Sequence, residues 1–228
     1  MSKAPGLLQT SVGKKYVMAI TGLILFGFVI GHLLGNLQVF AGPEKMNNYA
    51  AFLQGLGPAL WAVRAFLLIV FLSHVGVAIR LTRENRKARP VPYKRFETHV
   101  ASYASRTMAI SGILVLMFVI FHLLHYTVGA IDSDLMLVKD ATGRHDVYAM
   151  LVKGFSSPIV SGWYILCMAL LSSHLSHGFF SLFQTLGLND PKNDGKIKLV
   201  SGLIAIFIFL GYSSVPVAVL AGILKYPY

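Results

Sequence analysis

The stretch YVMAITGLILFGFVIGHLLGNLQVF, residues 16–40, decides the fold class, because it is long and apolar enough to cross a lipid bilayer. After Tyr16, its only ionisable side chain is that of His32. An ionisable group inside a membrane is costly and marks a candidate functional site. The stretch therefore predicts a membrane helix that carries a functional histidine.

Four more apolar stretches of similar length follow along the 228 residues. Only 13% of the chain is charged, whereas a soluble protein carries about 25%. The sequence thus predicts an all-α integral membrane protein with a single domain over residues 1–228. Its five transmembrane helices are expected at about 16–40, 60–82, 107–130, 158–187 and 200–224.

The basic residues are concentrated in the loops, and this distribution favours a membrane protein over a nucleic-acid-binding protein. With the N-terminus inside, 14 of the 20 Lys and Arg residues fall on the inner side. The positive-inside rule therefore predicts a cytoplasmic N-terminus and an outer C-terminus in a bacterial inner membrane. The densest cluster, Arg80–Arg106, is expected either to bind anionic lipid headgroups or to dock a soluble partner.

The remaining segments predict smaller features. The first stretch has no small-residue cleavage site, so we expect it to be kept as a helix. The single Cys167 excludes a disulfide within the chain and a CxxC metal site. The connections Gly42–Gly57 and Asp132–Ser157 are each expected to hold a short amphipathic helix on the membrane surface.

Histidines stand in four of the five apolar stretches, and none of the five contains Asp or Glu. They are His32, His74, His122 and His174. At about 1.5 Å per helical residue, His32 and His122 lie roughly 24 Å from the inner side. His74 and His174 lie nearer to that side, at roughly 12 and 18 Å. The sequence therefore predicts an outer and an inner histidine pair.

Two pairs of this kind suit two haems, one above the other, within the helix bundle. Imidazoles from two facing helices close both axial positions of one iron, an arrangement that favours electron transfer over oxygen binding. Two alternatives stay open. The histidines either have structural roles, bonded to neighbouring serines or to the backbone, or they relay protons in a haem-free proton-coupled transporter.

The segments around these histidines resemble those of a known family. They are FVIGHLLGN around His32, FLSHVG around His74, SGILVLMFVIFH ending at His122, and HLSHGFFS beginning at His174. In order and on separate helices, they are similar to the four ligand segments of the cytochrome b558 subunit of succinate:quinone oxidoreductases. The resemblance covers nearly the whole chain, and this family's fifth helix carries no ligand.

This resemblance implies a function and a set of partners. His32 and His122 would bind an outer haem b, and His74 and His174 an inner haem b. The subunit would anchor a flavoprotein with FAD and an iron–sulfur protein, which hold the succinate site, and would pass electrons to quinone, typically menaquinone. The fumarate reductase direction, and a cytochrome b subunit of a hydrogenase or formate dehydrogenase, are the nearest alternatives. No catalytic residue is expected on this chain, and a higher oligomer of the complex is possible.

The resemblance also bears on neighbouring residues. His125 and His177 each follow a ligand by three positions on the same helix face, so either could replace it. We expect them instead to contact a propionate or a quinone carbonyl. Ser105 and Arg106 are expected to hold a propionate of the inner haem. Some fumarate reductases of the family carry a proton-conducting glutamate where this chain has Ser172, so that proton path is not expected here.

Two further clusters are candidates near the outer side. Asn36, Gln38, Trp61 and Arg64 would line a quinone pocket, although Trp and Arg are also ordinary residues of the membrane interface. Gly27, Gly31 and Gly35 recur every four residues beside His32. Such small residues admit either a neighbouring helix or a porphyrin plane.

Overall fold

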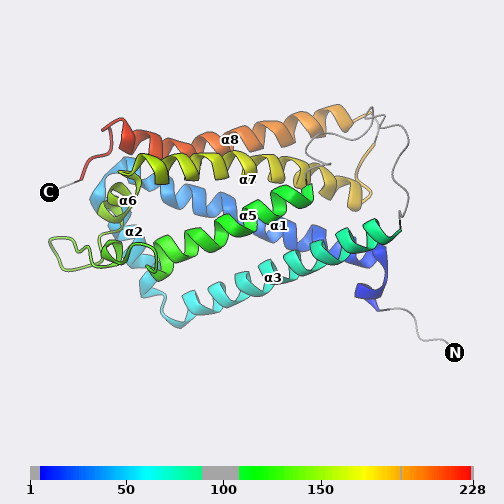
Figure 1. Ribbon diagram of the computed structural model, residues 1–228, viewed down its shortest axis with the longest axis horizontal. Coiled ribbons are helices and arrows are strands. Elements are labelled where there is room, and N and C mark those ends of the chain that lie inside the picture. Colours follow the sequence, from blue (N-terminus) through cyan, green and yellow to red (C-terminus); the bar gives the residue numbers. More distant parts are fainter. Residues whose placement is uncertain (1–5, 89–107, 191, 227–228) are drawn as a thin grey trace.

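The computed structural model describes residues 6–88, 108–190 and 192–226, and in these residues the chain forms an elongated helical bundle (Figure 1). Within the described residues, five helical spans are long and apolar enough to cross a membrane, and the first and third of them include the short turn that follows the long helix. This number and the all-α class agree with the sequence prediction. The long helices are α1 (Ser11–Asn36), α3 (Pro58–Lys87), α5 (Met108–Leu123), α7 (Pro158–Thr185) and α8 (Asp194–Leu220).

The helix ends differ from the predicted ends by a few residues, because capping and charged turns set them rather than hydrophobicity. The Thr10 hydroxyl accepts a hydrogen bond from Gly13 N at 3.0 Å, so α1 begins before the apolar run. The basic turns after Thr82 continue α3 to Lys87. After α1 the chain tightens into the 3-10 helix Leu37–Ala41. After α5 it widens into a π-helical turn, Leu124–Val128, that Gly129 ends at φ +73°.

Two short helices, α2 (Pro43–Gly55) and α6 (Val147–Phe155), lie together at one end of the bundle (Figure 1). The chain's C-terminus is at this end, and its N-terminus is at the opposite end. Both connections therefore contain a helix, as predicted. The expected position on the membrane surface is wrong for α6. From Tyr148 to Phe155, every residue of this helix except Lys153 is buried. That helix packs inside the protein against α7 and α8.

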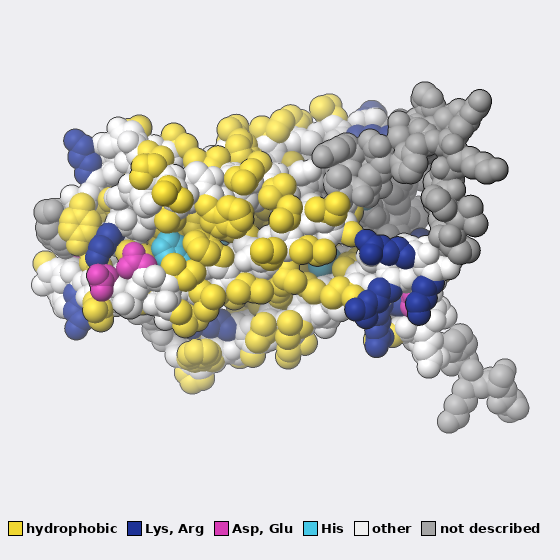
Figure 2. Space-filling model, viewed as in Figure 1, with side chains coloured by type: hydrophobic (Ala, Val, Ile, Leu, Met, Phe, Trp, Pro, Cys, Tyr) yellow, Lys and Arg dark blue, Asp and Glu magenta, His cyan; other side chains and the backbone are white. Residues whose placement is uncertain are grey.

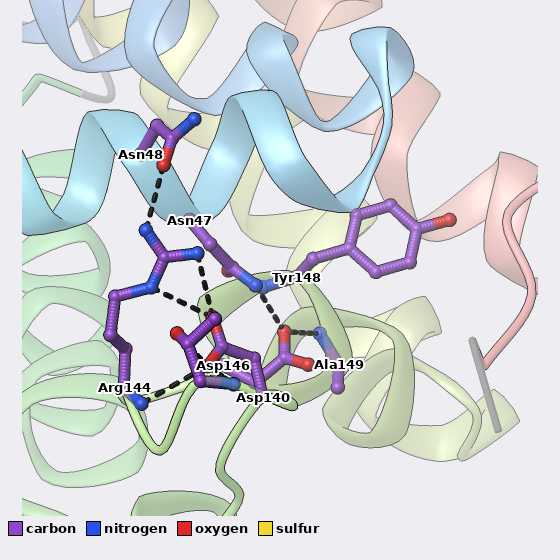
Figure 3. Close-up of polar contacts among 8 residues, drawn as sticks. Asn47, Asn48, Asp140, Arg144, Asp146, Tyr148 and Ala149 are labelled. Atoms are coloured by element: carbon purple, nitrogen blue, oxygen red, sulfur yellow. Dashed lines mark hydrogen bonds and ion pairs between the residues drawn. The ribbon is translucent and has the colours of Figure 1, made fainter.

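A polar clamp of Asn47 from α2 and Asp146 from the α6 cap joins these two helices (Figure 3). The Asn47 amide donates to Asp146 Oδ1 at 2.9 Å, and Asn47 Oδ1 accepts from Tyr148 N at 3.1 Å. Asp146 also caps α6 by accepting from Ala149 N at 2.9 Å. Both side chains are buried, so the clamp fixes the end of the bundle nearest the outer histidines.

An ion pair on the surface extends this clamp. Arg144 donates to Asp140 through Nε at 2.9 Å and to Asn48 Oδ1 at 2.7 Å (Figure 3). Hydrogen bonds from the Thr142 hydroxyl and from Arg144 lower the pKa of Asp140 to about 2. The carboxylate therefore stays ionised and keeps the loop closed at every physiological pH.

At the opposite end, α1 and α3 are joined by an ion pair between Lys14 and Glu84. The Lys14 side chain is buried, and Glu84 is partly open to solvent. Between the two ends, hydrophobic side chains cover most of the face shown in Figure 2, and charged side chains lie toward the ends. This distribution is what a bundle surrounded by lipid requires.

Candidate haem-binding histidine pairs

The outer histidines meet in the structure. His32 of α1 and His122 of α5 have ring centroids 5.9 Å apart, with ring planes at 73°. Two imidazoles that bind opposite faces of one iron, with metal–nitrogen bonds of about 2 Å, place their ring centres about 6 Å apart. Phe28 stacks on His32 and Phe118 on His122. The pair therefore fits the two axial positions of a haem.

The inner histidines lie on two different helices, His74 on α3 and His174 on α7. His174 lies close enough to His74 for their charges to interact. The Nδ1 atom of His74 is 3.0 Å from the hydroxyl of Thr21 on α1, and that of His174 is 3.1 Å from the hydroxyl of Ser111 on α5. Each inner histidine is therefore held through Nδ1 by a neighbouring helix, which leaves Nε2 for another partner.

Glycines lie beside both of these contacts. A Cβ atom at Gly22 would be 3.4 Å from His74 Cε1, and one at Gly112 would be 3.4 Å from His174 Cε1. Each inner imidazole thus contacts a hydroxyl residue and the glycine that follows it, Thr21–Gly22 for His74 and Ser111–Gly112 for His174. The sequence alone did not indicate that these residues contact a histidine. The signal was present, however, because each dipeptide begins 11 residues before an outer histidine on the same helix.

His125 occupies the π-helical turn after α5 and is 2% exposed. Its Nδ1 atom is 3.1 Å from the Tyr164 hydroxyl, which is also 3.4 Å from His122 Nδ1. Tyr164 therefore bridges the two histidines, a role that the sequence did not indicate. The other histidine expected beside a ligand, His177, lies partly buried on α7, one turn after His174.

Several other predicted site residues lie elsewhere or outside the described residues. Ser105 and Arg106 fall outside the described ranges. Trp61 is 67% exposed, and the Arg64 guanidinium lies 5.0 Å from the centre of its ring, so these two contact each other at the start of α3. Ser172 is buried on α7, and within the described part of the chain its hydroxyl has no hydrogen-bond partner.

The glycines of α1 serve different purposes. A Cβ atom at Gly35 would lie 2.8 Å from the Tyr49 hydroxyl, so this glycine admits a side chain from α2. At Gly27 and Gly31 the described residues place no atom within 4 Å of such a Cβ. Helix packing therefore explains Gly35, and space remains beside the other two glycines.

The histidine pairs suit haem better than a bare metal ion. Among the described residues, no group of three or more His, Cys, Asp or Glu side chains comes together as a metal site. Two imidazoles are too few to hold a bare ion, whereas a haem brings four nitrogen ligands of its own and needs only the two axial ones. The donor set and the separation of the outer rings both fit a haem.

Comparisons with known proteins identify the family of this chain. Residues 82–212 match the family model described as succinate dehydrogenase/fumarate reductase transmembrane subunit. The chain is also 25% identical over 198 residues to the succinate dehydrogenase cytochrome b558 subunit of Bacillus subtilis (strain 168), across 85% of this chain and 89% of that relative. No solved structure matches the chain. The chain therefore belongs to the family of succinate dehydrogenase/fumarate reductase transmembrane subunits, as a membrane cytochrome b anchor subunit.

Proposed function

We propose that this chain is the membrane anchor of a succinate:menaquinone oxidoreductase and binds two haems b. His32 and His122 would hold the outer haem, and His74 and His174 would hold the inner haem. The observation that carries the proposal is the 5.9 Å separation of the His32 and His122 rings, which suits one iron between them.

The neighbouring histidines support this choice of ligands. His122 faces His32 directly, whereas His125 is buried with its Nδ1 on Tyr164. His174 is held on Ser111 within electrostatic range of His74. We therefore assign His125 and His177 to the surroundings of the haems, not to the irons.

The chain's own residues provide a dry, fixed frame. Aromatic rings of Phe28, Phe118 and Tyr164 pack against the outer pair. The buried clamp of Asn47 and Asp146 closes the bundle at that end. When bound, haem supplies reversible one-electron transfer, and the protein supplies ligands, orientation and low polarity.

The proposed partners follow from the family and from the relative's name. A flavoprotein with FAD and an iron–sulfur subunit dock at the inner end, where Arg80, Arg83, Arg86 and Lys87 form an exposed basic turn of α3. Ser105 and Arg106 are proposed to hold a propionate of the inner haem. We prefer succinate oxidation as the direction of the reaction because the relative is a succinate dehydrogenase subunit. We prefer succinate dehydrogenase partners over a hydrogenase or formate dehydrogenase because the family model describes succinate dehydrogenase and fumarate reductase subunits.

The first experiment is a reduced-minus-oxidised spectrum of the purified protein with a pyridine haemochrome count. We expect two haems b per chain. His32→Ala and His74→Ala should each leave one haem, because each removes one axial ligand of a different iron. Redox titration should show that the two variants retain different haems.

His177→Ala is the matched control for His174→Ala, since it removes an imidazole from the same helix one turn away. We expect it to keep both haems. A folded, haem-supplied wild-type chain without a Soret band would refute the proposal and favour the haem-free transporter. Loss of haem in His177→Ala but not in His174→Ala would refute the ligand assignment.

A further inference from the structure

Thr21 and Ser111 each hold the imidazole of an inner histidine on a neighbouring helix, although neither belongs to the ligand set. Thr21 Oγ1 lies 3.0 Å from His74 Nδ1, and Ser111 Oγ lies 3.1 Å from His174 Nδ1. Both hydroxyls are buried, at 8% residue exposure. Two independent sites in different halves of the chain thus have the same arrangement.

The direction of each hydrogen bond follows from the hydroxyl's other contact. A hydroxyl has a single hydrogen, and a backbone carbonyl only accepts. Thr21 Oγ1 donates to Val17 O at 2.7 Å, and Ser111 Oγ donates to Met108 O at 3.0 Å. With that hydrogen on the backbone carbonyl, each hydroxyl accepts from the imidazole, and both histidines then carry their proton on Nδ1.

That proton position leaves the Nε2 lone pair free, which is the form that binds a metal. Each ring also lies close to the adjacent glycine, because a Cβ atom at Gly22 would be 3.4 Å from Cε1 of His74 and one at Gly112 would be 3.4 Å from Cε1 of His174. A side chain longer than methyl at either glycine would meet the ring at its Cε1 edge. Each dipeptide therefore forms a seat that sets the tautomer and the plane of one imidazole.

We propose that Thr21–Gly22 and Ser111–Gly112 are positioning residues that tune the inner haem by holding Nδ1 of its two ligands. The proposal rests on the function proposed above. A hydrogen bond accepted from Nδ1–H makes the imidazole more basic, and a more basic ligand stabilises the oxidised iron. The two hydroxyls therefore lower the midpoint potential of the inner haem without touching it.

The seats also relate the two halves of the molecule. Thr21 precedes His32 by 11 residues on α1, and Ser111 precedes His122 by 11 residues on α5. Each of these helices thus carries a seat for an inner histidine and, about 16 Å further along, an outer histidine. The pairs α1–α3 and α5–α7 repeat one arrangement, which keeps the two histidine layers at a fixed spacing.

The test measures the midpoint potentials of both haems by redox titration of the purified protein. Thr21→Val removes the acceptor with little change in shape, and Ser111→Ala removes the second one. We expect each variant to raise the potential of the inner haem and to leave that of the outer haem unchanged. The double variant should show about the sum of the two shifts, because the seats lie on different helices.

Two controls separate positioning from packing. Thr21→Ser keeps the hydroxyl and should restore the wild-type potential. Ser201→Ala removes a buried hydroxyl of α8 that donates to Ile197 O at 2.7 Å, and it should shift neither potential. Loss of the inner haem alone in Thr21→Val, with retention in Thr21→Ser, would also support the proposal, because a folding failure would remove both haems.

Other outcomes overturn the inference. Unchanged midpoint potentials in variants that keep two haems would refute the role of Thr21 and Ser111 and leave the proposed function intact. A Thr21→Ser variant that behaves like Thr21→Val would have the same meaning. Equal shifts of both haems would show a general structural effect instead. A wild-type chain without haem would refute the proposed function itself, independently of the seats.

Discussion

Leu33 follows the outer histidine of α1, and its side chain is fully buried against α8. A Cβ atom added at Gly211 would lie 2.9 Å from Leu33 Cδ1 and 3.0 Å from Cδ2. Because Leu33 is fully buried, we expect Gly211→Ala to overpack this contact and to destabilise the protein by about 1–3 kcal/mol. The melting temperature in detergent should fall by roughly 2–4 °C per kcal/mol.

Gly202→Ala is the control for this substitution on the same helix. No described atom lies within 4 Å of a Cβ there, so the change should be neutral or stabilise α8 by up to about 1 kcal/mol. Equal melting temperatures for the two variants would show that close contact between α1 and α8 does not depend on Gly211.

Single residues are easiest to propose from a sequence where their chemistry is unusual for their surroundings. A histidine in an apolar stretch is conspicuous, so all four candidate ligands and their pairing could be proposed from the sequence. Thr21 and Ser111 were overlooked because a hydroxyl inside a membrane helix ordinarily bonds its own backbone. Both do so here, and only the folded structure shows that the same oxygens also meet an imidazole.

The two short helices α2 and α6 depend on one buried contact between elements far apart in the chain. Asn47 of α2 and Asp146 at the start of α6 are 99 residues apart in sequence. We expect Asn47→Ala to cost about 1–3 kcal/mol, because it removes a donor to Asp146 and leaves the buried Tyr148 N–H without its acceptor. Hydrogen exchange of the first turn of α6 should accelerate, while that of α3 should not change.

Asn48→Ala is the matched control for Asn47→Ala. The Asn48 side chain accepts from Arg144 at the surface, so its loss should change stability by no more than about 0.5 kcal/mol. Similar exchange rates in the two variants would contradict a special role for the buried clamp.

The positions of the long helices were predictable from the sequence, but the burial of a short helix by its neighbours was not. Five long apolar runs are a strong local signal, and only capping residues such as Thr10 moved their ends. The burial of α6 could not be read from its own residues, because it depends on the faces of α7 and α8 that cover it. A short apolar helix has the same pattern on a membrane surface as inside a protein, so the sequence could not separate the two positions.

The whole molecule has its two chain termini at opposite ends, as five membrane crossings require (Figure 1). The bundle's ends differ in charge, and the positive-inside rule assigns the end with Lys14, Glu84 and the basic turn of α3 to the cytoplasm. The helices α2 and α6, with the outer histidines, then face the outside. This orientation follows from the distribution of Lys and Arg alone, and it stays a prediction.

Cysteine labelling tests the orientation cleanly, because the native Cys167 is buried at 2% exposure and should stay unlabelled. Lys225→Cys places a thiol at the exposed C-terminal end, and Lys87→Cys places one at the exposed end of α3. A maleimide that cannot cross membranes should label Lys225→Cys in intact cells and leave Lys87→Cys unlabelled. Inside-out vesicles should reverse this pattern, and solubilised protein should label at both positions.

The labelling result also decides how the histidine layers relate to the soluble partners. If Lys87→Cys is labelled from outside, the basic turn of α3 cannot meet a cytoplasmic iron–sulfur subunit. The pair His74 and His174 would then be the distant one, and the proposed order of the two haems would be reversed. Labelling from the inner side keeps that pair nearest to the partner, which is the arrangement the proposed electron transfer to quinone needs.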